Sequence, residues 1–274
     1  MNDQFAQRFF SGRHLYGDDF SEEEIQKWYA EEEEASYAQR ESRGVAHIDQ
    51  YQMLNYVHFF RRLSAKSFKV CLAFGCAGGE ELVPLSRHVN RFIAIEPAKK
   101  WWKSNIAGIP ATYLQPNPLG DVPCADRSVD LITCFSVLHH IPNVSRVIAE
   151  FSRVLRPQGL LLIREPNNTL GDWRQRRSGG SKGSKNERGI PQRWFEDTFR
   201  RSGLRILSRS YAMFPATTRL AGTLNIPFPF NHRAMTWFDA ALGKLTSWNI
   251  HYHRDSIFKK IAPGTNCYIL ERQA

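Results

Sequence analysis

Several features that would assign this chain to a broad class of protein are absent from its sequence. No apolar run approaches the roughly 20 residues that a helix needs to span a bilayer. The opening residues, MNDQFAQRFFSGRH, contain no apolar signal core. The five cysteines are odd in number and show no C-x-x-C spacing, which argues against a disulfide framework and against a zinc site. We therefore expect a cytoplasmic protein with no transmembrane segment and no bound metal.

The glycine-rich turn CLAFGCAGGE (71–80) also lacks the residues that bind phosphates in two common nucleotide sites. A dinucleotide fingerprint that starts at Gly75 would need glycine where Ala77 and Glu80 stand. A phosphate loop would need lysine and then serine or threonine after Gly79, but two glutamates follow. Because carboxylates repel phosphates, a cationic or zwitterionic ligand fits this turn better.

Length and composition indicate one large folded domain, alone or with an added segment. The chain has 274 residues, of which 42% are hydrophobic and 12% aromatic, enough for a substantial core. The formal net charge is +10, and basic residues gather in a glycine- and serine-rich loop, residues 172–190. This basic loop is compatible with a solvated segment or with a nucleic-acid patch. The solvated segment is favoured, so nucleic acid is a possible partner but not the expected one.

Apolar strand candidates alternate with helical stretches along most of the chain. We expect strands at 69–74, 92–96, 111–115, 129–135, 159–165, 204–211 and 265–272. Helices are expected at 79–89, 98–106, 143–155 and 191–203. This alternation predicts an α/β domain over residues 65–274, with a parallel sheet and helices on both faces. Before the last strand lies an inserted segment rich in aromatic residues, 212–263.

The residues before this domain are expected to be helical. Ser21 and Glu24 form the S-x-x-E pattern that caps a helix start, which predicts a helix over 21–40. A second helix is predicted over 47–63. We interpret residues 1–64 as an N-terminal helical lid region beside the glycine turn.

Four ordered segments resemble the motifs of class I S-adenosylmethionine-dependent methyltransferases. They are LAFGCAGGEE (72–81), FIAIEP (92–97), DRSVDLITCFSVLHHIP (126–142) and RVLRPQGLLLIREP (153–166). The resemblance implies a Rossmann-like, seven-stranded methyltransferase sheet and S-adenosyl-L-methionine as cofactor. Two residues depart from the family's first motif, because Ala73 replaces its usual acid and Ala77 its middle glycine. Glu80 or Glu81 is expected to replace the missing acid.

The resemblance also implies which residues bind the cofactor. The turn under the methionine moiety would consist of Gly75, Cys76, Ala77 and Gly79. Glu96, followed by Pro97, would accept hydrogen bonds from the ribose hydroxyls, and Phe135 ends the fourth strand nearby. Asn117 is the candidate for the adenine, with Asp121 as its competitor.

The candidate catalytic residues are His140, His139 and Glu165. Histidine can take a proton from an attacking hydroxyl near neutral pH. The match to sugar O-methyltransferases with an L-H-H turn implies that Glu165 orients one imidazole, and His140 is preferred as the base. We expect methyl transfer to a small-molecule or glycan acceptor, at a hydroxyl oxygen. Two alternatives stay open: an RNA methyltransferase, and a non-catalytic protein with a degenerate methyltransferase fold.

Overall fold

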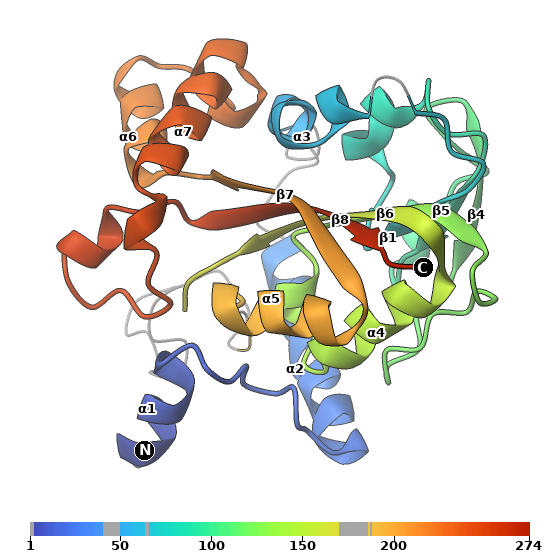
Figure 1. Ribbon diagram of the computed structural model, residues 1–274, viewed down its shortest axis with the longest axis horizontal. Coiled ribbons are helices and arrows are strands. Elements are labelled where there is room, and N and C mark those ends of the chain that lie inside the picture. Colours follow the sequence, from blue (N-terminus) through green and yellow to red (C-terminus); the bar gives the residue numbers. More distant parts are fainter. Residues whose placement is uncertain (1–2, 41–49, 64–65, 170–185, 187) are drawn as a thin grey trace.

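The structure, a computed structural model, is built around one mixed β-sheet (Figure 1). It describes residues 3–40, 50–63, 66–169, 186 and 188–274. The sheet has eight strands in the order β3-β4-β2-β1-β5-β6-β8-β7. Their bounds are β1 Cys71–Phe74, β2 Phe92–Ile95, β3 Asn105–Ile106, β4 Ile109–Leu114, β5 Val129–Phe135, β6 Leu155–Pro166, β7 Leu204–Ala212 and β8 Thr265–Arg272.

The central strands pair in parallel, as the alternating sequence pattern predicts. Parallel pairs join β4 to β2, β2 to β1, β1 to β5 and β5 to β6. In contrast, β8 is antiparallel to both of its neighbours, β6 and β7. The carboxyl ends of five parallel strands therefore meet at one edge of the sheet, where open α/β sheets bind ligands.

The prediction of seven strands is wrong by one, because β3 forms a short antiparallel pair with β4. The two strands are joined by Ala107 and Gly108, which have φ values of 51° and 82°. Such left-handed residues suit a tight hairpin between strands. The helix predicted over 98–106 is accordingly a single 3-10 turn, Lys99–Trp101, followed by β3.

Helices cover both faces of the sheet, as predicted (Figure 1). On one side lie α1 Asp3–Phe10, α2 Glu22–Arg40, α4 Val144–Val154 and α5 Gln192–Arg201. On the other side lie α3 Gln52–His58, α6 Pro215–Thr223 and α7 Arg233–Leu245. The second predicted helix, 47–63, begins at residues outside the described ones, and in its described part α3 ends at His58 and a 3-10 turn, Phe60–Arg62, follows. The predicted helix over 79–89 is also a 3-10 segment, Glu80–Leu85, which contains Pro84.

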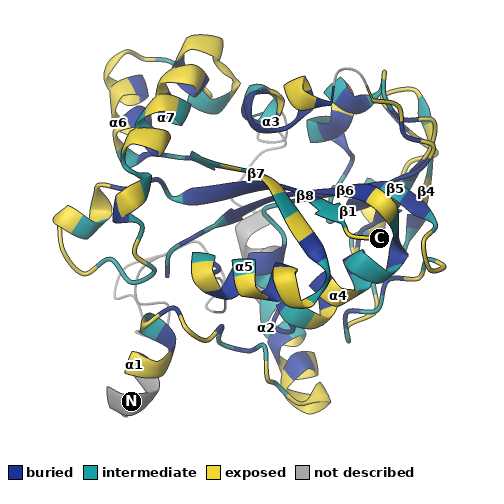
Figure 2. Cartoon of the chain, in the orientation of Figure 1, coloured by how far each residue is buried: buried dark blue, intermediate teal, exposed yellow. Residues whose placement is uncertain are grey.

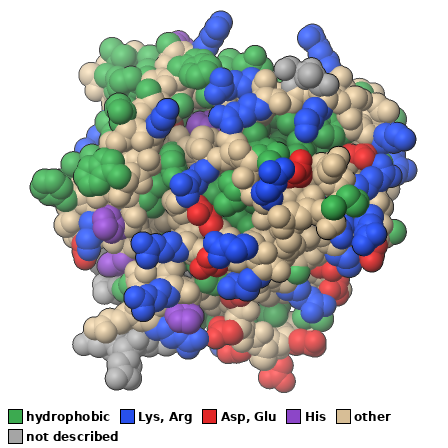
Figure 3. Space-filling view, viewed as in Figure 1, with side chains coloured by type: hydrophobic (Ala, Val, Ile, Leu, Met, Phe, Trp, Pro, Cys, Tyr) green, Lys and Arg blue, Asp and Glu red, His purple; other side chains and the backbone are tan. Residues whose placement is uncertain are grey.

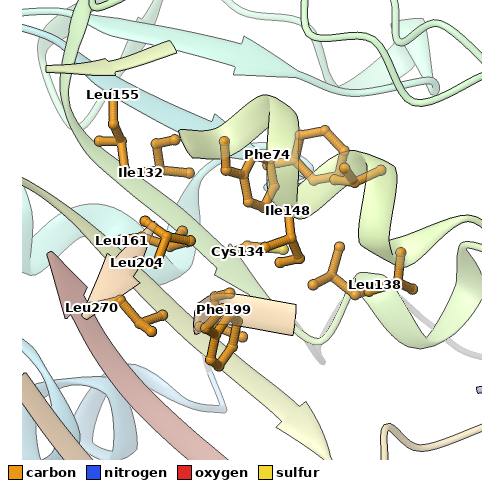
Figure 4. Close-up of a cluster of buried hydrophobic side chains, with 14 of the residues drawn as sticks. Phe74, Ile132, Cys134, Leu138, Ile148, Leu155, Leu161, Phe199, Leu204 and Leu270 are labelled. Atoms are coloured by element: carbon orange, nitrogen blue, oxygen red, sulfur yellow. The ribbon is translucent and has the colours of Figure 1, made fainter. Parts of the chain in front are cut away.

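Two apolar cores, one on each face, hold these layers together. The first packs α4 and α5 on the sheet, with Phe74, Ile148 and Phe199 among its buried residues (Figure 4). The second packs the α3 side, with Leu54 and Phe92 fully buried. Figure 2 shows the central strands buried and the outer faces of the helices exposed. Strands covered on both faces read as continuous apolar runs, which explains why the sequence located them well.

The inserted segment predicted before the last strand folds into short helices between β7 and β8. It contains α6, α7 and 3-10 turns at Pro229–Asn231, Ser247–Asn249 and Phe258–Lys260. The buried carboxylate of Asp239 on α7 accepts hydrogen bonds from the backbone N–H groups of Met213 and Phe214 and from the hydroxyl of Thr217. These bonds fix α7 to the end of β7. In the described part of the chain, no helix is both long and apolar enough to cross a membrane.

Candidate active site at the carboxyl edge of the sheet

The turn after β1 requires glycine at two positions. Gly75 has φ +66°, and a Cβ there would lie 2.5 Å from Cγ2 of Val137. Gly79 has φ +81°, and a Cβ there would lie 2.6 Å from Cγ2 of Ile106. Both the backbone conformation and the close neighbours exclude a larger residue. The turn is therefore held tightly between the loop after β5 and the short strand β3.

Glu96, at the end of β2, closes this turn from the adjacent strand. Its side chain is buried, and Oε2 accepts a hydrogen bond from the backbone N–H of Ala77 at 2.9 Å. Oε1 accepts another from the N–H of Ala98 at 3.0 Å. A carboxylate offers about four acceptor positions, so both oxygens retain capacity for ligand hydroxyls. The following residue, Pro97, is exposed to solvent.

A cavity of about 190 Å³ lies beside the turn. Its lining residues are Phe74, Gly75, Cys76, Ala77, Glu81, Leu82, Thr133 and Phe135. Four of the predicted cofactor-binding residues thus meet in one place: Gly75, Cys76, Ala77 and Phe135. Burial raises the pKa of the Cys76 thiol to about 12, so this residue forms a wall of the cavity rather than a nucleophile.

Two glutamates, Glu80 and Glu81, begin the 3-10 segment that follows the glycine turn. Glu81 lines the cavity and forms an ion pair at 3.1 Å with Arg164, which is only 1% exposed. Glu80 pairs through Oε1 with Lys103 at 2.7 Å. Its Oε2 is buried, and no described residue donates a hydrogen bond to it. Buried carboxylate oxygens of this kind suit a cationic ligand and disfavour a phosphate.

Arg164, the ion-pair partner of Glu81, is also held by three other side chains. Its guanidinium lies 4.7 Å from the ring centroid of Tyr51 and 5.3 Å from that of Phe135. It also donates a hydrogen bond to Oδ1 of Asn55 on α3. No spacing in the sequence indicates that Asn55 or Tyr51 would meet Arg164.

Asn117 is not brought to this cavity. It is exposed, its Nδ2 donates to Asp121 Oδ2 at 3.0 Å, and its Oδ1 accepts from the N–H of Leu119 at 2.8 Å. Asp121 in turn pairs with Arg146. Both candidates for the adenine contact therefore take part in local turn interactions.

Behind the end of β5, Glu165 and His139 form a buried pair. Glu165 Oε2 lies 2.8 Å from His139 Nδ1, and the two residues are 1% and 5% exposed. Glu165 Oε1 accepts hydrogen bonds from the backbone N–H groups of Val137 and Leu138, both at 2.8 Å. One carboxylate thus fixes both the imidazole and the turn that carries it.

His140 has a different partner. Its ring lies 4.0 Å from that of His139, and its Nδ1 lies 3.0 Å from Glu32 Oε2 on α2. Its side chain is 44% exposed. The imidazole oriented by Glu165 is therefore that of His139, not that of His140, the histidine preferred from the sequence.

Arg188, at the end of the basic loop, is not solvated. It is fully buried, and it donates hydrogen bonds to the carbonyls of Tyr16, His139, Ile141 and Pro142. Burial lowers the pKa of its guanidinium to about 10. Arg188 thus fastens the L-H-H turn to the N-terminal region. The other basic residues of the loop, Arg174, Arg176, Arg177, Lys182 and Lys185, lie outside the described residues.

Known proteins resemble this chain around the same segment. Residues 72–163 match the family described as "Methyltransferase domain". A "Probable S-adenosylmethionine-dependent methyltransferase" of Mycobacterium tuberculosis is 27% identical over 126 residues, 44% of this chain and 44% of that protein. A ubiquinone biosynthesis O-methyltransferase of Proteus mirabilis is 24% identical over 125 residues, 44% of this chain and 50% of that protein.

A solved S-adenosylmethionine dependent methyltransferase from Mesorhizobium loti has the same fold. Its TM-score is 0.50 at 12% identity, over 77% of this chain and 96% of that one. This likeness concerns the fold alone. The chain spans half or less of the length of the two curated relatives. Residues 72–163 therefore resemble the methyltransferase domain of known S-adenosylmethionine-dependent enzymes, and the described strand order agrees with that resemblance.

Proposed function

We propose that this protein transfers a methyl group from S-adenosyl-L-methionine to a hydroxyl oxygen of a small-molecule or glycan acceptor. The observation that carries the proposal is the buried pair of Glu165 and His139, with Nδ1 and Oε2 2.8 Å apart. This pair lies at the carboxyl edge, where the glycine turn and Glu96 also lie. A base at this position is needed for an alcohol acceptor, because a hydroxyl must lose its proton as it is methylated.

The residues around the glycine turn fit this cofactor. Glu96 would bind the ribose, the turn and Phe135 would enclose the methionine end, and Glu80 and Glu81 would face its positive charge. The cavity of about 190 Å³ is smaller than a site for a whole drug-sized ligand, so it suits one end of the cofactor. When bound, the cofactor supplies a methyl group attached to a positively charged sulfur. After the transfer this sulfur is part of a neutral thioether, which makes it a good leaving group.

The protein's own contribution is to place the acceptor and to remove its proton. A neutral imidazole that donates from Nδ1 to Glu165 carries its basic lone pair on Nε2. We assign this Nε2 of His139 as the acceptor of the hydroxyl proton, a contribution of about 10²–10⁴-fold. His140, paired with Glu32, would assist by placing the acceptor. Correct placement is worth up to about 7–11 kcal/mol in favourable cases.

Two other regions are proposed to shape the acceptor site. The N-terminal region, 1–64, contacts the site from both faces of the sheet, since Trp28 Nε1 donates to the carbonyl of His140 and Asn55 accepts from Arg164. These contacts support its role as a lid. Phe230, in the inserted segment, stacks on Tyr51 with the two ring centroids 6.2 Å apart.

Cytoplasm is the proposed compartment, supported by five cysteines that are all free.

Calorimetric titration with S-adenosylmethionine, followed by a tritiated-methyl transfer screen against cell extracts, tests the function. We expect saturable binding that weakens at least tenfold in Glu96→Ala, while the exposed control Glu23→Ala binds like the wild type. Labelled product from a neutral small-molecule or glycan fraction, unaffected by salt, is the expected transfer result. No binding at millimolar cofactor would favour a non-catalytic protein, and salt-sensitive labelling of RNA would favour the RNA alternative.

A further inference from the structure

A second, larger hollow lies between α3 and α7, apart from the cavity at the glycine turn. Its volume is about 490 Å³, and its lining residues are Met53, Tyr56, Arg61, Arg62, Arg233 and Trp237. None of these residues lines the cofactor cavity. Figure 3 shows blue side chains bordered by green ones where α3 and α7 face each other in Figure 1. We call this hollow the arginine groove.

The groove gathers positive charge without a negative side chain in its lining. Arg61 and Arg62 follow α3, whereas Arg233 begins α7, so distant parts of the sequence bring three guanidinium groups together. Among the described residues, neither Arg62 nor Arg233 forms an ion pair. Arg62 donates a hydrogen bond to the neutral hydroxyl of Ser208. Burial and the charge of Arg61 lower the pKa of Arg62. A lowered pKa is expected for a partly buried cation that lies close to another cation.

The walls of the groove are aromatic and apolar. The guanidinium of Arg61 lies 4.7 Å from the ring centroid of Trp237, which holds it over the ring face. Trp237 is 42% exposed and Tyr56 is 47% exposed, so both rings remain open to a ligand. Arg233 is the first residue of a 13-residue helix, where backbone N–H groups and the helix dipole add to the attraction for anions.

We propose that the arginine groove binds the phosphate group of a phosphorylated small molecule. Guanidinium groups present paired N–H donors that match phosphate oxygens, and three of them match a diphosphate better than a single carboxylate. The rings of Trp237 and Tyr56 would contact the organic part of the same molecule. Phosphate binding in the groove can be tested apart from cofactor binding, because the groove shares no lining residue with the cofactor cavity.

Direct titration of the whole 274-residue chain tests the groove without any methylation assay. The probes are inorganic pyrophosphate and uridine diphosphate, titrated at 50 mM and 200 mM salt. We expect both to bind the wild type, and both affinities to fall at least tenfold in Arg233→Gln. Arg219→Gln is the matched control, since it removes the same charge from an exposed residue of the neighbouring helix α6.

The outcomes separate a built site from general attraction to a basic protein. The proposal is supported if Arg219→Gln binds both probes with wild-type affinity and Arg233→Gln binds them at least tenfold more weakly. Equal weakening in both variants would assign the binding to net charge and overturn the proposal, as would the absence of binding to the wild type. Retention of both affinities in Glu96→Ala is also expected. Their loss in that variant would place the phosphate at the glycine turn instead.

Discussion

The carboxylate of Glu165 holds the imidazole of His139 at 2.8 Å in an environment from which water is almost excluded. The same carboxylate also accepts two backbone N–H groups of the turn after β5. Because all of these donors converge on one side chain, the ring position and the turn conformation depend on each other. This arrangement favours His139 over His140 as the base.

Replacing His139 with glutamine should lower kcat by about 10²–10⁴-fold, while the dissociation constant of S-adenosylmethionine stays within twofold of the wild type. The physical reason is loss of the proton acceptor without loss of cofactor contacts. His140→Gln is the matched variant, and we expect it to raise KM more than it lowers kcat. Steady-state kinetics with the acceptor from the transfer screen measures both. A wild-type kcat in His139→Gln would contradict this assignment and indicate that His140 is the base.

Two glycines with nearly the same backbone conformation allow packing to be separated from backbone strain. Gly79 and Gly108 have φ of +81° and +82°, but only Gly79 has a close neighbour, Ile106. Gly108→Ala should cost about 1–2 kcal/mol of unfolding free energy, from the left-handed conformation alone. Gly79→Ala should cost at least 1 kcal/mol more and weaken cofactor binding. Urea unfolding of both variants measures the difference. Equal losses of unfolding free energy would show that the side chain of Ile106 moves aside without an energetic cost.

His58 should make the protein less stable in acid. It is buried at the end of α3 beside Ser210, and burial, followed by the charges of Arg164, Arg61 and Arg62, lowers its pKa from 6.5 to about 3. The unfolded chain therefore binds more protons than the folded chain between these two values. Stability is retained above pH 6.5 and falls as the pH drops toward 3, by up to about 1.4 kcal/mol per pH unit.

Unfolding free energies measured at pH 6.5 and pH 5 check this sign. The wild type should lose about 2 kcal/mol more than His58→Gln over this interval. His14→Gln, which changes an exposed histidine, should behave like the wild type. An identical acid response of His58→Gln and wild type would mean that the ring is protonated in the folded protein.

Arg188→Gln should be among the most destabilising single changes in this chain. It leaves the carbonyls of Tyr16, His139, Ile141 and Pro142 without their buried donor, at an expected cost of about 3 kcal/mol or more. Arg200→Gln, which breaks an exposed ion pair with Asp197, should cost about 0.5 kcal/mol or less. Urea unfolding compares the two, and similar losses would contradict the fastening role of Arg188.

The strands could be predicted because their signals are local, whereas the pairing of Glu165 with a histidine was implied by the family resemblance. A strand covered on both faces is a short apolar run, and residues at the ends of neighbouring parallel strands must meet at one edge. The hairpin of β3 was missed because Ala107 in a left-handed conformation is an uncommon turn signal. The helix over 79–89 was wrong because Pro84 restricts the backbone there.

The partners of the site from other elements could not be predicted. Glu32 lies 108 positions from His140, and Asn55 lies 109 positions from Arg164. No sequence spacing specifies such contacts, because they depend on how α2 and α3 pack against the finished sheet. Arg188 was grouped with its basic neighbours for the same reason, although its burial sets it apart.

The position of β8 in the sheet has a consequence for synthesis of the protein. Residues 265–272 lie between β6 and β7, and β7 ends the order of described strands. The nascent chain therefore cannot complete the sheet until these residues have left the ribosome. Until then β6 exposes an open edge and β7 has no strand to pair with, so fragments that stop before residue 265 are expected to depend on chaperones and to be degraded.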